Sequence, residues 1–280
     1  MRLARLRVDG RERPAAWDGQ SWRDLSGITS DIDGGLLSSG LDAVRAGGGL
    51  EQLPALAEPV RYGPPLGSIG KIVCIGLNYR DHAEETGAAL PPEPIVFMKA
   101  PDTVIGPQDE VLIPRGSTKT DWEVELGVVI GSPVRYLDSP ADSLRHVAGY
   151  LVSHDVSERE FQLERAGQWD KGKNCETFNP MGPWLVTADE VADPQDLGVR
   201  LWVNGQLRQD GNTKNMIFDV AYLVWYLSQF MVLRPGDVIN TGTPAGVALG
   251  SPDYAYLRPG DVVELEIDGL GRQRQTIGQA

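Results

Sequence analysis

A succession of short, apolar β-type runs from Gly70 onward constrains the fold of this chain more than any other feature. Each run is bounded by turn-forming residues, as β-strands are. The runs are Lys71–Ile75, Ile95–Met98, Val111–Ile113, Trp122–Ile130, Val147–Val152, Trp184–Val186, Val199–Val203, Val238–Asn240 and Val262–Ile267. One long helix, Met216–Met231, is apolar nearly all round, so we expect it to be buried. Short strands around one helix predict a β-rich α+β fold, a roll or barrel, because alternating strand–helix units are absent.

The first 66 residues differ from the rest and predict a small N-terminal domain. Leu3–Val8 followed by Asp9-Gly10 is typical of a strand entering a hairpin turn. Two short helical pieces follow, Leu41–Ala46 and Leu50–Leu56, and Pro59–Gly67 has the composition of a linker. We therefore expect a small domain at residues 1–66 and the main domain at residues 67–280.

The charge balance excludes several classes of partner. The 280 residues include 26 Lys or Arg and 39 Asp or Glu, a formal net charge of −13. Such a surface repels phosphate groups, so neither nucleic acid nor an anionic membrane is an expected partner. An acidic substrate would need a metal ion or a local cluster of Lys and Arg. The dinucleotide-binding pattern Gly-x-Gly-x-x-Gly is absent from the sequence.

Features that bear on location predict a cytoplasmic protein. The N-terminus has no apolar core of the signal-peptide kind, and polar residues interrupt the most apolar stretch, Ile217–Leu233. Cys74 and Cys175 lie far apart, so neither a disulfide framework nor a thiolate zinc site is expected.

Glu123 and Glu125 stand within an apolar strand pattern. The period of two in a strand puts both carboxylates on one face and Val124 and Leu126 on the other. A bridging cation would relieve the repulsion between them, and carboxylate oxygens suit Mg²⁺ or Mn²⁺. The alternative is an edge strand with a solvated polar face. Asp155, at the end of the run Val147–Val152, is a candidate third ligand or a helix N-cap.

His82 and Glu85 lie on a predicted two-turn helix with Asn78 as its N-cap and Gly87 after its end. Their spacing of three residues places them on one face. A carboxylate beside an imidazole orients it and raises its basicity, which suits a general base acting on water. A helix this short is marginally stable alone, so it would serve as a lid. The alternative is a surface helix with incidental charge pairs.

Lys173 follows Lys171 in a polar segment, where it either stabilises charge in a site or keeps the surface soluble.

Together these segments resemble the fumarylacetoacetate hydrolase superfamily. The resemblance covers roughly residues 68–275, and the first 65 residues fit the small N-terminal domain of part of that family. The matching motifs are Ile75–Gly87, Asp121–Gly131, Asp155–Arg159, Gly172–Pro183, Met216–Phe218, Pro235–Ile239 and Thr241–Pro244.

The resemblance implies a mixed β-sandwich roll, usually a homodimer, with Mg²⁺ or Mn²⁺ held by three carboxylates. By motif these ligands are Glu123, Glu125 and Asp155, and the catalytic residues are His82, Glu85 and Lys173. Substrate-binding side chains are expected at Arg159, Gln162 and Thr243. His154 stands where the family usually has Asn, Asn174-Cys175-Glu176 replaces Ser-x-Asp, and Ala245 follows Pro244 where a second Pro is common, so the resemblance does not fix the substrate.

The resemblance leads to the hypothesis of a metal-dependent carbon–carbon bond hydrolase acting on a 2,4-diketo acid or acylpyruvate. The ion would chelate the 2-oxo acid and stabilise the enolate that departs. His82, held by Glu85, would deprotonate the attacking water, and Lys173 would stabilise developing charge. The alternative is a lyase or isomerase on the same intermediate: an oxaloacetate-type decarboxylase, a 2-oxo-dienoate hydratase or a tautomerase. A non-catalytic metal-binding or acid-binding roll would not need the His82–Glu85 pair.

Overall fold

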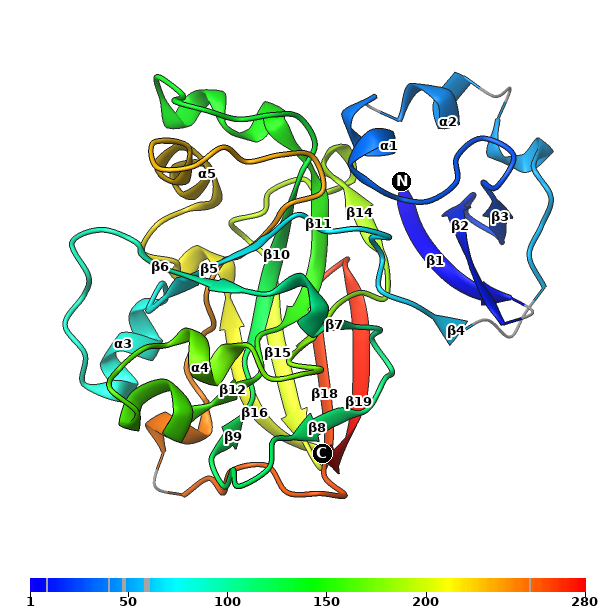
Figure 1. The fold of residues 1–280 in the computed structure, drawn as a ribbon. Helices are drawn as coiled ribbons and strands as arrows, with labels where there is room; N and C mark the ends of the chain where they lie inside the picture. Colours follow the sequence, from blue (N-terminus) through cyan, green and yellow to red (C-terminus); the bar gives the residue numbers. More distant parts are fainter. Residues whose placement is uncertain (9, 40, 47–48, 58–60, 252) are drawn as a thin grey trace.

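The computed structural model describes the chain except residues 9, 40, 47–48, 58–60 and 252 (Figure 1). Two β-sheets dominate it, so the chain has the predicted β-rich α+β fold. The helices are short: α1 (Gly34–Ser38), α2 (Asp42–Ala46), α3 (Arg80–Thr86), α4 (Asp170–Lys173) and α5 (Val220–Ser228). A π-helical segment, Glu160–Glu164, precedes α4.

The larger sheet contains ten strands and is mixed. The strands β17 and β5 are parallel, and all other neighbouring strands of this sheet are antiparallel. In spatial order its strands are β3 (Trp22–Asp24), β2 (Arg11–Trp17), β1 (Arg2–Val8), β14 (Leu185–Thr187), β11 (Val147–His154), β10 (Val124–Ile130), β17 (Val238–Asn240), β5 (Ile72–Gly76) and β6 (Ile95–Lys99), and β4 (Arg61–Tyr62) pairs with β1.

The smaller sheet has five strands: β16 (Gln206–Asn212), β15 (Gly198–Val203), β18 (Val262–Ile267), β19 (Gly271–Gln279) and β8 (Val111–Ile113). Two short ladders, β12 (Ser157–Glu158) with β9 (Thr120–Asp121) and β13 (Asn179–Pro180) with β7 (Val104–Ile105), complete the strands of the described chain.

The core fills the space between the two sheets. Leu126 and Val128 of β10 join Val199 and Leu201 of β15 and Leu265 of β18 in one buried cluster. The other face of β10 is also covered, since Val129 packs with Leu151 and with residues of the N-terminal strands. A strand buried on both faces reads as a continuous apolar run, so a charged side chain within it needs a partner.

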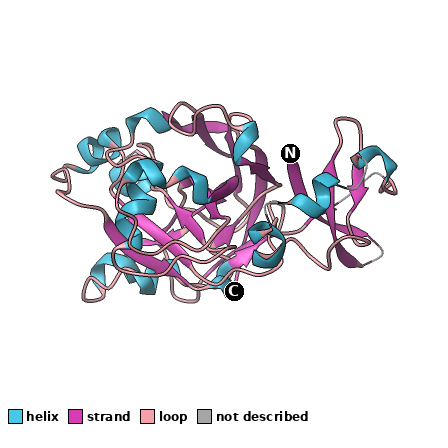
Figure 2. Ribbon diagram, turned by 90° about the horizontal axis from the view of Figure 1, so that it is seen from above, coloured by secondary structure: helices cyan, strands magenta, loops and turns pink. Residues whose placement is uncertain are grey.

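The N-terminal strands extend the larger sheet through the β1–β14 pair. Figure 2 shows this part of the chain beside the main body. The predicted turn residue Asp9 and part of the predicted linker Pro59–Gly67 lie outside the described residues. The helical prediction for Leu50–Leu56 is wrong beyond Gln52: only Leu50–Gln52 forms a 3-10 turn, and Ala55 instead bridges to Arg23 of β3.

The predicted helix Met216–Met231 is shorter in the structure. Asp219 caps α5 by accepting a 2.7 Å hydrogen bond from the Tyr222 amide, so the helix begins only at Val220. One face of α5 is buried, and Tyr222 and Trp225 on the other side are half-buried. No described helix is long and apolar enough to cross a bilayer.

Candidate active site

Three buried carboxylates meet where β10 begins and β11 ends. Val124 of β10 pairs with His154 of β11, and this antiparallel register brings Glu123 and Glu125 next to Asp155. One carboxylate oxygen from each residue lies within 4.8 Å of the other two. The side chains are 5%, 1% and 0% exposed, respectively. The alternatives of a solvated edge strand for the two glutamates and of a helix cap for Asp155 are therefore wrong, since β10 is an inner strand and Asp155 lies inside the cluster.

Two buried lysines hold part of this negative charge. Lys173 donates to Glu123 Oε2 and to Asp155 Oδ2, both at 2.8 Å, and its Nζ lies 5.0 Å from the ring centroid of Phe97. Lys99, at the end of β6, donates to Asp155 Oδ1 and to the Val156 carbonyl. Burial lowers the pKa of Lys173, but Asp155 and Glu123 outweigh burial and raise it, so the side chain is an ammonium at neutral pH. The solubility role considered for Lys173 is thus excluded.

The pKa values of Glu123 and Glu125 are shifted in opposite directions. Burial raises the pKa of Glu123, but Lys173 and Arg159 more than compensate and hold it below its usual range. Glu125 lacks such a cation and accepts a 2.8 Å hydrogen bond from the Gly242 amide. Burial, followed by the charges of Asp155 and Glu123, raises the pKa of Glu125 well above its usual value. The protein alone therefore disfavours a negative charge on Glu125, whereas it favours one on Glu123.

Arg159 connects the cluster to neighbouring segments. Its Nε donates to Asp121 at 2.8 Å, and Nη1 lies 2.8 Å from Glu123 Oε1 and 3.1 Å from Gln162 Oε1. The third nitrogen, Nη2, is buried and has no hydrogen-bond partner in the described chain. A buried donor without a partner is costly, so this atom is available for a ligand.

His82 faces the same cavity from α3. Its Nδ1 lies 3.5 Å from Glu85 Oε2, and both Glu85 oxygens accept from the Gly246 amide at 3.0 Å. The ring is 7% exposed. The alternative of incidental surface charges is therefore wrong, because His82 is buried and Glu85 is fixed by a second segment of the chain.

Asn78 does not cap α3 as predicted, because the helix begins one residue later, after Tyr79. Asn78 is buried, and its side chain donates to the Phe218 and Thr241 carbonyls and accepts from the Phe218 amide. These bonds fix the chain on one side of Leu77, which has φ of 51°. A positive φ is rare for a bulky residue and costs about 1–3 kcal/mol, so the surrounding structure imposes it.

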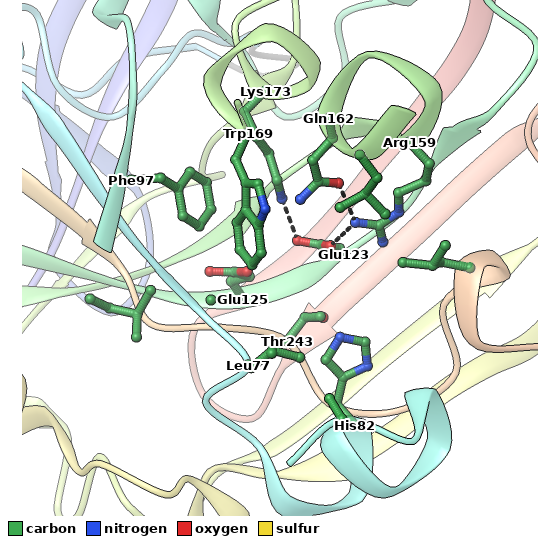
Figure 3. A pocket seen from close by; sticks show the side chains of 15 residues that line it. Leu77, His82, Phe97, Glu123, Glu125, Arg159, Gln162, Trp169, Lys173 and Thr243 are labelled. Atoms are coloured by element: carbon green, nitrogen blue, oxygen red, sulfur yellow. Dashed lines mark hydrogen bonds and ion pairs between the residues drawn. The ribbon is translucent and has the colours of Figure 1, made fainter. Parts of the chain in front are cut away.

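These groups line a cavity of about 200 Å³ (Figure 3). Its polar side chains are His82, Glu123, Glu125, Arg159, Gln162, Lys173 and Thr243, and its apolar lining is Ile75, Leu77, Ala88, Phe97, Leu163, Trp169 and Leu249, with Gly76. Thr243 donates to the Val124 carbonyl and accepts from Gln209. Gly76 is required here, because a Cβ at this position would lie 2.4 Å from the Trp169 ring.

The structure gathers all nine residues expected at the site. Seven line the cavity, while Glu85 lies behind His82 and Asp155 lies behind Lys173. Sequence reasoning missed Lys99, whose signal was a lysine ending an apolar strand, and it gave no role to Asp121, which accepts from Arg159 and from the Ala248 and Leu249 amides.

The donor set fits a divalent cation. Carboxylate oxygens are the ligands that Mg²⁺ and Mn²⁺ prefer, and the three carboxylates offer one oxygen each in a confined space. Burial and the charges of Asp155 and Glu123 disfavour the charged form of Glu125, and a positive charge beside it would favour that form. A divalent ion between Glu123, Glu125 and Asp155 would supply it.

Comparison with known proteins identifies relatives along the whole chain. A protein of Burkholderia multivorans described as a hydrolase is 52% identical over 285 residues, and the match covers 100% of both chains. A fumarylacetoacetate hydrolase from Exiguobacterium antarcticum has a similar structure, with a TM-score of 0.89, 35% identity and 100% of both chains covered.

Two other solved structures differ in the activity that their descriptions give. One is a maleylpyruvate hydrolase from Sphingobium sp. SYK-6 in complex with manganese(II) and pyruvate, with a TM-score of 0.82, 30% identity and 100% of both chains covered. The other is a 5-carboxymethyl-2-hydroxymuconate delta-isomerase from Mycobacterium smegmatis, with a TM-score of 0.79, 30% identity and coverage of 100% of this chain and 99% of that one.

The family model described as fumarylacetoacetate (FAA) hydrolase C-terminal matches residues 71–278, which include the three carboxylates, His82 and Lys173. The chain therefore belongs to the fumarylacetoacetate hydrolase superfamily of enzymes.

Proposed function

We propose that this enzyme hydrolyses a carbon–carbon bond in a 2,4-diketo acid of the acylpyruvate type. The observation that carries the proposal is that His82, paired with Glu85, faces the same small cavity as Glu123 and Glu125, which form the carboxylate cluster together with Asp155. A cation site alone would serve several reactions of 2-oxo acids. A histidine held by a carboxylate adds a base that can activate water.

Glu123, Glu125 and Asp155 would hold the ion, which is Mg²⁺ or Mn²⁺. When bound, the ion supplies Lewis-acid stabilisation of the negative charge that develops on the 2-oxo acid. The relative from Sphingobium supports this choice, because its structure contains manganese(II) and pyruvate. Pyruvate is also the fragment that hydrolysis of an acylpyruvate would release.

His82 acts as the general base in this proposal. Glu85 Oε2 lies 3.5 Å from Nδ1, which favours a proton on that nitrogen and leaves Nε2 to take a proton from water. The water oxygen bonds to the C4 carbonyl carbon, and the C3–C4 bond then breaks. Its electron pair stays with the three-carbon fragment, which is protonated at C3 and leaves as pyruvate, while C4 leaves as a carboxylic acid.

The remaining polar groups bind and orient the substrate. The unpartnered Nη2 of Arg159 is placed to donate to a substrate oxygen, and Gln162 and Thr243 line the same cavity. Lys173, a buried ammonium, stabilises negative charge on the reacting fragment. Lys99 and Asp121 hold these groups in place rather than facing the cavity.

A direct assay tests the proposal. The protein is first treated with EDTA and then incubated with acylpyruvates in H₂¹⁸O, with and without MnCl₂. We expect loss of the diketo absorbance only with the ion, and equal amounts of pyruvate and of a carboxylic acid that carries one ¹⁸O atom. Turnover without any label in the acid, or full activity in EDTA, would contradict hydrolysis.

Isomerisation is the second candidate, because the structurally similar protein from Mycobacterium smegmatis is described as an isomerase. An isomerase moves protons and consumes no water. Given a 2-hydroxydienoate in place of the acylpyruvate, it would convert that substrate without release of pyruvate. Given oxaloacetate, a decarboxylase would release CO₂.

Assembly and domain division are part of the same proposal. We expect a homodimer, which sedimentation velocity would detect as twice the 30.5 kDa chain mass.

We also expect residues 1–66 to form a small domain attached to a catalytic domain at residues 67–280. Deletion of the first 66 residues should leave the carboxylate site intact, although it removes β1, one of the two strands paired with β14, and the N-terminal side chains that cluster with Val129 of β10.

A further inference from the structure

The lining of the cavity changes character away from the carboxylates. Figure 3 shows Phe97 and Trp169 on one side of the polar cluster and Leu77 on another, beside Thr243 and His82. Phe97 and Trp169 pack edge to face, with ring centroids 5.4 Å apart. Leu163 and Leu249, which are 41% and 39% exposed, line the cavity where it meets solvent. A ligand that extends away from the carboxylates therefore meets apolar surface.

The cations of this lining are already engaged. Among the described residues that line the cavity, the permanent cations are Arg159 and Lys173. Lys173 is paired with Glu123 and Asp155, and Arg159 is paired with Asp121 and Glu123. One guanidinium nitrogen, Nη2 of Arg159, is left without a partner, and it belongs to the group that contacts Glu123. The lining thus has one open cationic donor, at the polar end.

The charges of the buried cluster lead to the same conclusion. It contains four carboxylates and three cations joined by ion pairs or close contact: Asp121, Glu123, Glu125 and Asp155 with Lys99, Arg159 and Lys173. With all four carboxylates ionised the cluster carries one excess negative charge, and a divalent ion changes this to one excess positive charge. One substrate carboxylate neutralises that excess. A second carboxylate would find no counter-charge, and burial of an unpaired charge is strongly unfavourable.

We propose that the substrate carries one carboxylate only, at its 2-oxo acid head, and that its tail is uncharged and apolar, of the alkyl or aryl kind. This inference rests on the proposed function, since it takes the 2-oxo acid head as given, and it adds the substrate class. Leu77 is part of the tail site. The structure holds this leucine at a positive φ that glycine would adopt without strain, and its side chain lines the cavity.

Binding of unreactive 2-oxo acids tests the inference without any need for turnover. Isothermal titration calorimetry on the Mn²⁺-loaded full-length protein would compare pyruvate, 2-oxohexanoate and 2-oxoglutarate. All three share the head, and the last two differ in whether the tail ends in an alkyl group or a carboxylate. We expect 2-oxohexanoate to bind at least 30-fold more tightly than 2-oxoglutarate.

A charge placed at the mouth of the cavity gives a second, independent readout. Leu163→Arg adds a cation at an exposed lining position, so it should improve 2-oxoglutarate binding about tenfold relative to pyruvate binding. Leu207→Arg is the matched control, because Leu207 is 46% exposed and lies outside the cavity lining. It should change neither affinity.

The outcomes separate the two proposals. Tight 2-oxohexanoate binding together with the Leu163→Arg gain supports the apolar tail. If pyruvate binds but 2-oxoglutarate binds as tightly as 2-oxohexanoate or more tightly, the apolar tail is overturned while the proposed function stands. If none of the three acids binds the Mn²⁺-loaded protein, the proposed function fails and the tail assignment fails with it.

Discussion

Lys173 and Glu123 form a buried ion pair, with Nζ 2.8 Å from Oε2 and exposures of 1% and 5%. Lys173 also holds Asp155, so its removal leaves two buried carboxylates short of a counter-charge. We predict that Lys173→Met destabilises the metal-free protein by about 3–5 kcal/mol. Chemical denaturation in EDTA measures this change. Lys171→Met, on the same short helix but exposed, is the matched control, and equal stability of the two variants would contradict the pairing.

Glu125 is the carboxylate whose charge is least compensated by the protein, so it should gain most from a bound cation. We predict that Glu125→Gln weakens Mn²⁺ binding by more than the roughly 10–100-fold that loss of an outer-sphere partner costs. Calorimetric titration of Mn²⁺ into the EDTA-treated and dialysed protein gives the affinity. Glu84→Gln removes the same charge from an exposed position on α3 and should bind Mn²⁺ like the parent protein. Unaltered affinity in Glu125→Gln would show that the ion binds elsewhere.

His82 should matter for hydrolysis and not for the ion. Loss of a general base lowers rates by about 10²–10⁴-fold. We therefore predict a fall of that size in kcat for His82→Gln, with Mn²⁺ affinity within a factor of about three of the parent value. His146→Gln replaces a histidine that does not line the cavity and serves as the control. Retention of full kcat by His82→Gln would remove this residue from the mechanism.

His154 gives the protein a calculable sensitivity to acid. The ring is fully buried and bonded to Gln275, and burial lowers its pKa to about 4 from an ordinary value of 6.5. The unfolded chain therefore binds the proton more readily. The stability contributed by the neutral ring is complete above pH 6.5 and is lost as the pH falls toward 4, by about 3 kcal/mol.

The substitution His154→Asn removes this titration and keeps a polar side chain. We predict that its free energy of unfolding, measured in EDTA, falls about 3 kcal/mol less than that of the parent protein between pH 7 and pH 4. Parallel pH profiles for the two proteins would show that His154 is not the titrating group.

Much of the fold could be predicted because the strands carry their own signals. Asn204-Gly205 predicts the β15–β16 hairpin, and both residues have the positive φ that this turn requires. Local sequence patterns did not predict the helix bounds correctly where a capping residue or pairing with a distant segment determines them. Asp219 delays the start of α5, and pairing of Ala55 with Arg23 keeps residues after Gln52 out of a helix.

In the candidate site, too, some residue positions could be predicted from the local sequence and others depend on distant strands. Alternation along a strand places Glu123 and Glu125 together, and this could be predicted from their spacing. The approach of Asp155 depends on the register of β10 against β11, which spacing alone does not reveal, so the sequence left a third ligand and a helix cap as alternatives and the family resemblance favoured the ligand. Lys99 ends β6, which β5 and β17 separate from β10, so its position at the end of an apolar strand does not by itself identify Asp155 as its partner.

The central claim is that Glu123, Glu125 and Asp155 together hold one divalent ion. Crystals of the protein grown with MnCl₂ and measured at the manganese absorption edge test it directly through the anomalous difference map. The account predicts one strong peak at about 2.0–2.3 Å from a carboxylate oxygen of each of the three residues. An Mn²⁺ peak bound by other groups, or a map from fully loaded protein without a peak between these three carboxylates, would contradict it.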